Sequence, residues 1–257
     1  MLDTAAASSV QQNAAQQNVA DESESDMQAH WVHFISKNME LRDGYFKVSV
    51  LIIKWADGLD QLQVNKECQE LEDLFENTFK YETETLALGG SERTQLQLIS
   101  GIGNFAHKSG GEDNLLIVYY AGHGVYHKDK HLLEFFPSTN EPRSNFNNVY
   151  WNPAERLLID EVEADVLSIM DCCFSSDLVR NVVETGRTFE MLSASGVGQV
   201  TPAPGEKSFT RALIKCLKTL ESGSVGGSFT TRDVIEQIQK ERPLTPPALW
   251  RRIPGSE

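Results

Sequence analysis

The clearest indication of the fold comes from the stretch of residues 115–124, Leu115-Leu116-Ile117-Val118-Tyr119-Tyr120-Ala121-Gly122-His123-Gly124. Its first six residues form a continuous apolar run with the length and β-rich composition of a buried strand. A second apolar run, residues 165–170, ends at Asp171-Cys172-Cys173. Because open α/β sheets place their binding crevice at the carboxyl ends of parallel strands, we expect His123 and Cys173 to lie together there.

Strand-like and helix-like patterns alternate along the rest of the chain. A β-rich apolar run over residues 47–53 predicts the first strand, and residues 189–194 predict another. Helices are predicted where apolar residues recur at helical spacing. These positions are Val64, Cys68, Leu71 and Phe75; Leu96, Ile99, Ile102 and Phe105; residues 153–164; Phe209, Leu213, Cys216, Leu217 and Leu220; and Val234, Ile235 and Ile238. The alternation indicates an α/β fold with a mostly parallel central sheet flanked by helices.

The N-terminal part of the chain differs in composition from the rest. Ala, Gln, Asn and Ser dominate it, residues 21–26 carry four acidic side chains, and no Lys or Arg precedes Lys37. Such a segment buries too little apolar surface to fold, so we predict a disordered acidic arm over residues 1–40. One folded domain is predicted over residues 45–257.

Residues 135–151 are rich in turn-forming side chains and show neither a helical nor a strand period. Segments of this kind favour loops, and long loops inside compact domains usually serve a function. We therefore predict a long exposed loop after His123, at the rim of the expected crevice.

The composition excludes several classes of partner. The formal net charge is −14 and no cluster of Lys or Arg is present, which argues against nucleic acid and favours a basic peptide. No stretch approaches the roughly 20 apolar residues that span a bilayer, and no secretory signal is recognised. The four cysteines lack the spacing of a disulfide framework, which fits a reducing compartment. We therefore predict a cytoplasmic protein without membrane contact.

The two strand ends carry groups that suit nucleophilic catalysis. A cysteine attacks well only as a thiolate, and a nearby imidazole can take its proton. Gly122 and Gly124 permit a tight backbone path around His123, and the amides of Gly124 and Cys173 can point toward an oxyanion. Taken alone, a Gly-His-Gly turn or a buried cysteine is usually structural. Their joint occurrence favours a thiol nucleophile with a histidine base.

Two motifs carry a resemblance to a known family. The sequences YYAGHG at 119–124 and DCCFSS at 171–176 resemble the YSGHG and DSCHSG or DCCHSG motifs of metacaspases, in the caspase and metacaspase superfamily of cysteine peptidases. The histidine and the cysteine lie about 50 residues apart, as in caspases. SFTRAL at 208–213 is similar to a helix start in the small-subunit half of that fold. The resemblance covers residues from about Lys47 to near Pro247 and implies a caspase-like three-layer sandwich.

The resemblance also implies a role for each motif residue. Cys173, two positions after the aspartate, takes the place of the nucleophile, and His123 that of the general base. The amides of Gly124 and Cys173 take the place of the oxyanion hole, and Cys172 that of a buried neighbour. The implied activity is that of a cysteine endopeptidase in a cell-death or stress response.

The implied substrate preference depends on Asp171. Caspases that cleave after Asp carry Gln two positions before the cysteine, whereas metacaspases carry Asp there and prefer Arg or Lys. A carboxylate attracts a guanidinium and repels an acidic side chain, so cleavage after Arg or Lys is implied. When the first helix is aligned with that of metacaspases by its apolar spacing, Glu67 takes the place of their second pocket acid, so the resemblance implies that Glu67 also binds substrate. A solvated charge on the helix face is an equal alternative for Glu67.

Three positions depart from the metacaspase motifs: Phe174 replaces histidine, Ser176 replaces glycine and Ala121 replaces serine. In addition, the chain ends at residues 251–257, about where such folds add a final edge strand, which leaves open whether that strand is present. These features support a competing hypothesis, a catalytically impaired pseudo-peptidase that acts as a binding or assembly module. The oligomeric state stays open.

No cofactor and no metal site are predicted. His127 and His131 have the spacing of a metal pair on a helix, but they lie in a turn-rich segment without a third ligand. Some metacaspases need calcium, so the resemblance leaves calcium activation open. No EF-hand spacing identifies ligand residues for it.

Overall fold

A computed structural model describes residues 44–90, 93–140, 148–173, 187–196, 201–223 and 228–253. The chain divides into two units, Met1–Phe46 and Lys47–Glu257, and the fold described here is that of the second unit. The arm predicted over residues 1–40 lies outside the described residues.

Strands and helices alternate along the second unit. The strands are β1 (Lys47–Trp55), β2 (Glu82–Leu88), β3 (Asn114–Ala121), β4 (His123–His127), β5 (Leu132–Phe136), β6 (Val149–Tyr150), β7 (Asp165–Asp171), β8 (Phe189–Ser193) and β9 (Ala248–Ile253). The helices are α2 (Asn65–Asn77), α3 (Thr94–Ser109), α4 (Trp151–Asp160), α5 (Phe209–Gly223) and α6 (Thr231–Glu241).

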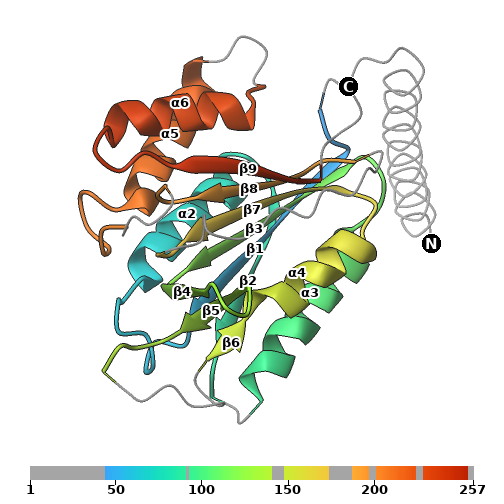
Figure 1. Ribbon diagram of the computed structural model, residues 1–257. Helices are drawn as coiled ribbons and strands as arrows, with labels where there is room; N and C mark the ends of the chain where they lie inside the picture. The colour runs from blue at the N-terminus through green and yellow to red at the C-terminus, as the bar shows by residue number, and fades with distance from the viewer. Residues whose placement is uncertain are drawn as a thin grey trace, which may run out of the picture. The chain divides into compact units, whose positions relative to one another are not determined.

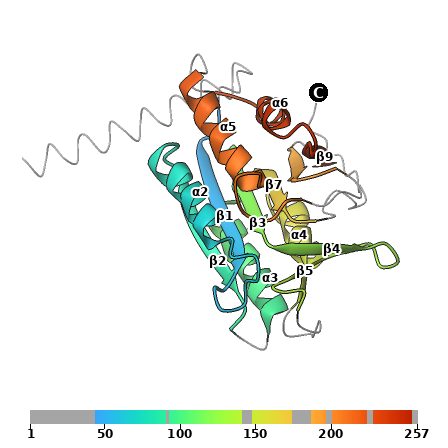
Figure 2. The ribbon, with the colours of Figure 1, turned by 90° about the vertical axis from the view of Figure 1, so that its left-hand side faces the viewer.

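Six strands form one sheet in the order β2-β1-β3-β7-β8-β9 (Figure 1). The first five run parallel to one another, and β9 pairs antiparallel with β8 at the edge. β4, β5 and β6 form a separate antiparallel sheet, and Figure 2 shows β4 and β5 leaving the main sheet as a hairpin. The predicted α/β fold with a mostly parallel sheet is confirmed.

Alternate side chains of β1 pack against helices on opposite faces of the sheet. Leu51 and Ile53 belong to a buried cluster that includes side chains of α3 and α4. Val50 and Ile52, which point to the opposite face, belong to a second buried cluster with α2, α5 and α6. Full burial of such a side chain stabilises a fold by roughly 1.5–3 kcal/mol. Helices therefore cover both faces of the sheet, as its continuous apolar runs predict.

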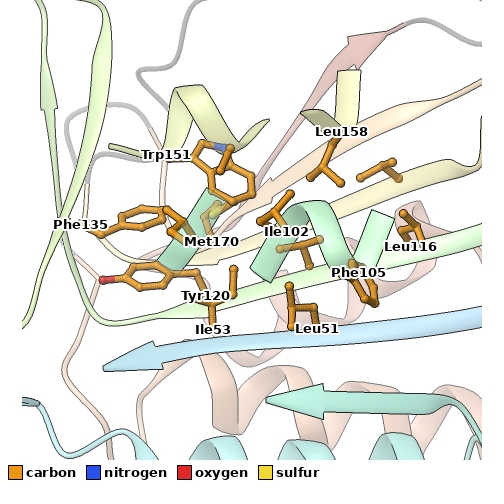
Figure 3. Close-up of a cluster of buried hydrophobic side chains, with 14 of the residues drawn as sticks. Leu51, Ile53, Ile102, Phe105, Leu116, Tyr120, Phe135, Trp151, Leu158 and Met170 are labelled. Carbon is orange, nitrogen blue, oxygen red and sulfur yellow. The ribbon is translucent and has the colours of Figure 1, made fainter. Parts of the chain in front are cut away.

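The prediction of a long exposed loop over residues 135–151 is wrong at both ends, although residues 137–140 and 148 form neither a helix nor a strand. Phe135 lies in β5, Trp151 begins α4, and β6 lies between them, while residues 141–147 are outside the described part. Figure 3 shows the reason, because Phe135 lies flat against Tyr120 with ring centroids 3.7 Å apart and Trp151 packs beside them. Burial of these rings in the core outweighs the local preference for turns.

The final edge strand, whose presence the sequence leaves open, is part of the sheet. Residues 248–253 form β9 and pair with β8. Arg252 of β9 is 3% exposed and donates to both carboxylate oxygens of Glu155 on α4, at 2.9 and 2.7 Å. This bidentate ion pair links the edge strand to the helical layer.

Candidate active site

The carboxyl ends of β3 and β7 bring the two predicted motifs together. Ala121 and Asp171 are paired residues of these parallel strands, and the Gly122 amide donates to the Asp171 carbonyl oxygen at 3.3 Å. His123 opens β4 just past the end of β3, and Cys173 follows the end of β7. Both residues therefore lie just past the carboxyl ends of neighbouring parallel strands, where α/β sheets form their binding crevice.

The close approach of the two turns requires glycine on the histidine side. A Cβ atom at position 124 would lie 2.7 Å from the Cys172 sulfur and 3.1 Å from the Cys173 carbonyl oxygen. Gly122 has a φ of +154°, and a side chain there would overlap the Tyr120 hydroxyl. Both glycines of the Gly-His-Gly motif thus serve packing as well as backbone conformation.

The His123 ring is held on one face and at one nitrogen. It stacks on Phe136, with ring centroids 5.2 Å apart and planes 4° from parallel, and its Nε2 lies 3.0 Å from Oε1 of Gln61. Burial lowers the pKa of His123, and the negative charge of Asp60 partly opposes this effect. The imidazole is therefore mostly neutral near pH 7 and able to accept a proton.

The Cys173 thiol is half-buried, whereas Cys172 is fully buried. Burial raises the pKa of Cys173, a hydrogen bond from the Thr201 backbone amide opposes the rise, and the charge of Asp171 adds to it. The thiol is therefore protonated near pH 7. A neutral imidazole and a protonated thiol suit a mechanism in which the base takes the proton during attack.

Asp171 lies at the end of β7, and its hydrogen bond and the nearby positive charge only partly offset the cost of burying its negative charge. Its Oδ2 accepts a hydrogen bond from the Thr210 hydroxyl at 2.6 Å, and the Thr210 oxygen lies 2.5 Å from the Tyr119 hydroxyl. Burial raises the pKa of Asp171 to about 6, although the Thr210 hydrogen bond and the charge of Arg242 lower it. Asp171 is therefore mostly ionised at pH 7 and above.

Glu67 is buried, with 5% exposure, so the alternative of a solvated charge on the helix face is wrong. Its carboxylate accepts hydrogen bonds from the Gly205 amide and the Ser208 hydroxyl, both at 2.8 Å, and lies 3.6 Å from Nε of Arg211. Its charge contributes to the raised pKa of Asp171. The two predicted pocket acids are thus electrostatically coupled, but both oxygens of Glu67 already have partners.

Sequence reasoning missed several residues of this site. Ser208 and Thr210 belong to the SFTRAL motif, which the resemblance identifies only as a helix start, and their hydroxyls were the available signal for hydrogen bonds to Glu67 and Asp171. Gln61, Thr201 and Arg242 lie in connecting segments and belong to no motif, so nothing in the sequence indicated them.

The remaining candidate residues are placed elsewhere or not described. Phe174 and Ser176 lie outside the described residues. The His127 ring contacts the Glu134 carboxylate, and the His131 ring lies 3.1 Å from the Tyr126 hydroxyl. In the described ranges, no group of three or more His, Cys, Asp or Glu side chains has a geometry that could hold a metal ion. No calcium ligand is assigned.

Comparison with known proteins identifies related folds. Residues 49–243 match the sequence model of the caspase domain family, whereas no curated protein matches the chain. The crystal structure of caspase-1 from Spodoptera frugiperda is similar with a TM-score of 0.56 and 9% sequence identity, over 82% of this chain and 89% of that chain. At this identity the structural likeness concerns the fold alone. None of the helices described here is long and apolar enough to cross a membrane.

Proposed function

The chain belongs to the caspase domain family of cysteine peptidases, and we propose that it is an endopeptidase that cleaves proteins after Arg or Lys. The observation that carries the proposal is the meeting of two strand ends, with His123 opening β4 and Cys173 following β7. A peptidase domain of this family acts on protein substrates. A role in a cell-death or stress response follows from the resemblance to metacaspases.

The proposed reaction uses His123 as base and Cys173 as nucleophile. The imidazole takes the thiol proton while the sulfur attacks the carbonyl carbon of the scissile bond. The carbon–nitrogen bond then breaks, the imidazolium gives its proton to the leaving amine, and a thioester stays on Cys173. His123 next takes a proton from water, which attacks the thioester and releases the carboxylic acid and the free thiol.

The amides of Gly124 and Cys173 are the proposed donors to the oxyanion. Support comes from the packing of Gly124, which has no side chain to keep its backbone away from the Cys173 turn. Removing one donor of this kind usually lowers kcat by about 10²–10³. Backbone donors cannot be deleted by a side-chain change, so only a change in the path of the backbone tests them.

The proposed preference for basic side chains rests on Asp171 rather than Glu67. Among the described residues, Asp171 accepts hydrogen bonds from the hydroxyl and the backbone amide of Thr210, and its carboxylate is the proposed partner of a substrate guanidinium or ammonium group. The two oxygens of Glu67 already accept hydrogen bonds from Gly205 and Ser208. Glu67 is therefore proposed to add negative charge beside Asp171 and not to bind the substrate itself.

A second candidate function, a binding or assembly module without catalysis, is favoured by one feature of the site. The Thr201 amide donates a hydrogen bond to the Cys173 sulfur, and the Gly205 amide donates one to the Glu67 carboxylate. The segment that carries both amides therefore contacts the nucleophile and the pocket acid together. If these contacts persist in the presence of a peptide, the domain binds partners without cleaving them.

Hydrolysis of a positional peptide library by the purified chain tests the proposal, with and without calcium. We expect turnover after Arg or Lys that disappears in Cys173→Ala and is largely kept in Cys172→Ala. Loss in Cys172→Ala with retention in Cys173→Ala would refute the assignment of the nucleophile. Folded protein without turnover under either condition would favour the binding module.

A further inference from the structure

Gln61 lies in the connection between β1 and α2, and three donors converge on its side-chain oxygen. The Thr139 amide lies 2.7 Å from Oε1 and the Thr139 hydroxyl lies 2.9 Å from it. Nε2 of His123 is the third group, at 3.0 Å. A single amide oxygen therefore links the histidine to the segment that follows β5.

These contacts identify the chemical nature of each atom. A backbone N–H can only donate, so the Gln61 atom that faces the Thr139 amide must be the oxygen and not the nitrogen of the side-chain amide. An amide oxygen cannot donate, so Nε2 of His123 must carry the hydrogen. In the neutral imidazole only one nitrogen is protonated, which leaves Nδ1 with a free lone pair.

The backbone around Gln61 is fixed, so this oxygen has a defined position. The Gln61 amide donates to the Pro137 carbonyl oxygen at 3.0 Å. Asp60, the residue before Gln61, accepts hydrogen bonds on its carboxylate from the backbone amides of Leu62 and Val64, at 3.0 and 2.7 Å. Asp60 is itself buried, with 8% exposure. Hydrogen bonds therefore hold Gln61 from its own connection and from the segment after β5.

The stacking partner of His123 completes the restraint. Phe136 covers one face of the imidazole with nearly parallel planes. This contact limits tilting of the ring, and the bond from Nε2 to Gln61 limits its rotation by a half turn. Such partners of a catalytic histidine commonly decide which nitrogen takes part in proton transfer.

We propose that Gln61 is the positioning residue of the peptidase, because its side-chain oxygen holds His123 in the tautomer that presents Nδ1 to the Cys173 thiol. This inference rests on the proposed function. In the first step the thiol proton moves to Nδ1, and both ring nitrogens of the resulting imidazolium carry hydrogen. The Nε2–H bond to Gln61 is kept throughout and becomes charge-assisted in the imidazolium.

Three substitutions at the exposed position 61 separate acceptor, neutral and donor side chains. Gln61→Glu keeps an acceptor and should leave kcat within roughly threefold of wild type. Gln61→Met removes the acceptor and should lower kcat roughly tenfold, a part of the 10²–10⁴ that a general base usually contributes. Gln61→Lys places a donor against Nε2, favours the opposite tautomer and should lower kcat by roughly 10² or more. KM should change by less than roughly twofold in each case, since Gln61 acts through His123 and not on the substrate.

The matched control is Gln69→Lys, at an exposed position on α2 whose side chain contacts Asp73. It makes the same change in charge and should leave both kcat and the melting temperature unchanged. A merely structural role of Gln61 would instead make the loss of activity follow the loss of thermal stability. An order of activity other than Glu, Met, Lys, or a parallel fall in thermal stability, would overturn the proposal.

The tautomer can be read without activity by ¹⁵N NMR of the full chain at pH 8, with His123 assigned from the signals lost in His123→Gln. We expect a protonated Nε2 and an unprotonated Nδ1 in wild type, and the reverse in Gln61→Lys. A protonated Nδ1 in wild type would overturn the proposal even if peptide turnover depends on Cys173. Turnover that persists in Cys173→Ala would instead refute the proposed function and leave the tautomer assignment intact.

Discussion

Asp171→Asn should stabilise the fold at alkaline pH while it removes the proposed preference for basic side chains. Burial raises the pKa of Asp171 from its usual 3.8 to about 6, although the hydrogen bond from Thr210 and the charge of Arg242 lower it. One pKa unit corresponds to about 1.36 kcal/mol, so the ionised carboxylate destabilises the fold by roughly 3 kcal/mol. Asparagine keeps an acceptor for the Thr210 hydroxyl without the charge.

The sign of this effect follows from proton binding. A carboxyl group with a raised pKa in the folded state stabilises the fold fully below pH 3.8, and this contribution is lost as the pH rises through about 6. The asparagine variant has no such loss. Its advantage over wild type should be roughly 3 kcal/mol at pH 8, roughly two thirds of that at pH 5.5, and small below about pH 4.

Urea unfolding of both proteins at pH 8 and pH 5.5 measures the difference. Asp73→Asn, at an exposed position on α2, makes the same change in charge and should shift the free energy of unfolding by less than about 0.5 kcal/mol. On the peptide library, Asp171→Asn should lose turnover after Arg and Lys selectively. A variant less stable than wild type at pH 8 would refute the reasoning, because the contacts of the ionised carboxylate would then outweigh its burial.

Two further substitutions test the packing of the site and the edge strand. Gly124→Ala should lower kcat/KM strongly, because the new Cβ would lie 2.7 Å from the Cys172 sulfur. The control Gly103→Ala on α3, whose new Cβ would lie 3.8 Å from its nearest atom, should leave kcat/KM unchanged. Equal activities of the two variants would contradict the packing argument. Arg252→Met should lower the free energy of unfolding by about 3–5 kcal/mol, because Glu155 is left buried without its ion-pair partner. Arg251→Met, at a side chain that is 66% exposed, should change the free energy of unfolding by less than about 0.5 kcal/mol in the same denaturation assay. Similar losses in the two variants would contradict the expected cost of leaving Glu155 buried without a partner.

The parts of the fold that the sequence predicts are those with strong local patterns. β3 and β7 are continuous apolar runs between helical layers, and their pairing follows from the parallel sheet. β2, with the sequence ETETLAL, was not predicted because it lies at the sheet edge and carries exposed Glu and Thr residues. β5 and β9 depend on distant contacts, those of Phe135 with Tyr120 and of Arg252 with Glu155. Local propensity does not contain such contacts.

In the candidate site, too, the sequence predicts the residues that follow strong local patterns and misses those whose role depends on distant contacts. His123 and Cys173 were predicted because each follows a strand that is visible in the sequence. Gln61 was not, since its role arises only when the connection after β1 meets Thr139 after β5. The burial of Glu67 likewise depends on a segment more than a hundred residues further along the chain, where Ser208 supplies its hydrogen bond.

Whether Cys173 is the nucleophile is tested most directly by mapping a covalent adduct. The full chain is incubated with a peptidyl acyloxymethyl ketone that carries Arg before the reactive carbon, and the modified residue is located by peptide mass spectrometry. We predict one adduct, on the Cys173 sulfur, whose formation is slowed by an excess of an Arg-containing peptide substrate. An adduct on Cys172, or a folded chain that forms no adduct, would contradict the assignment.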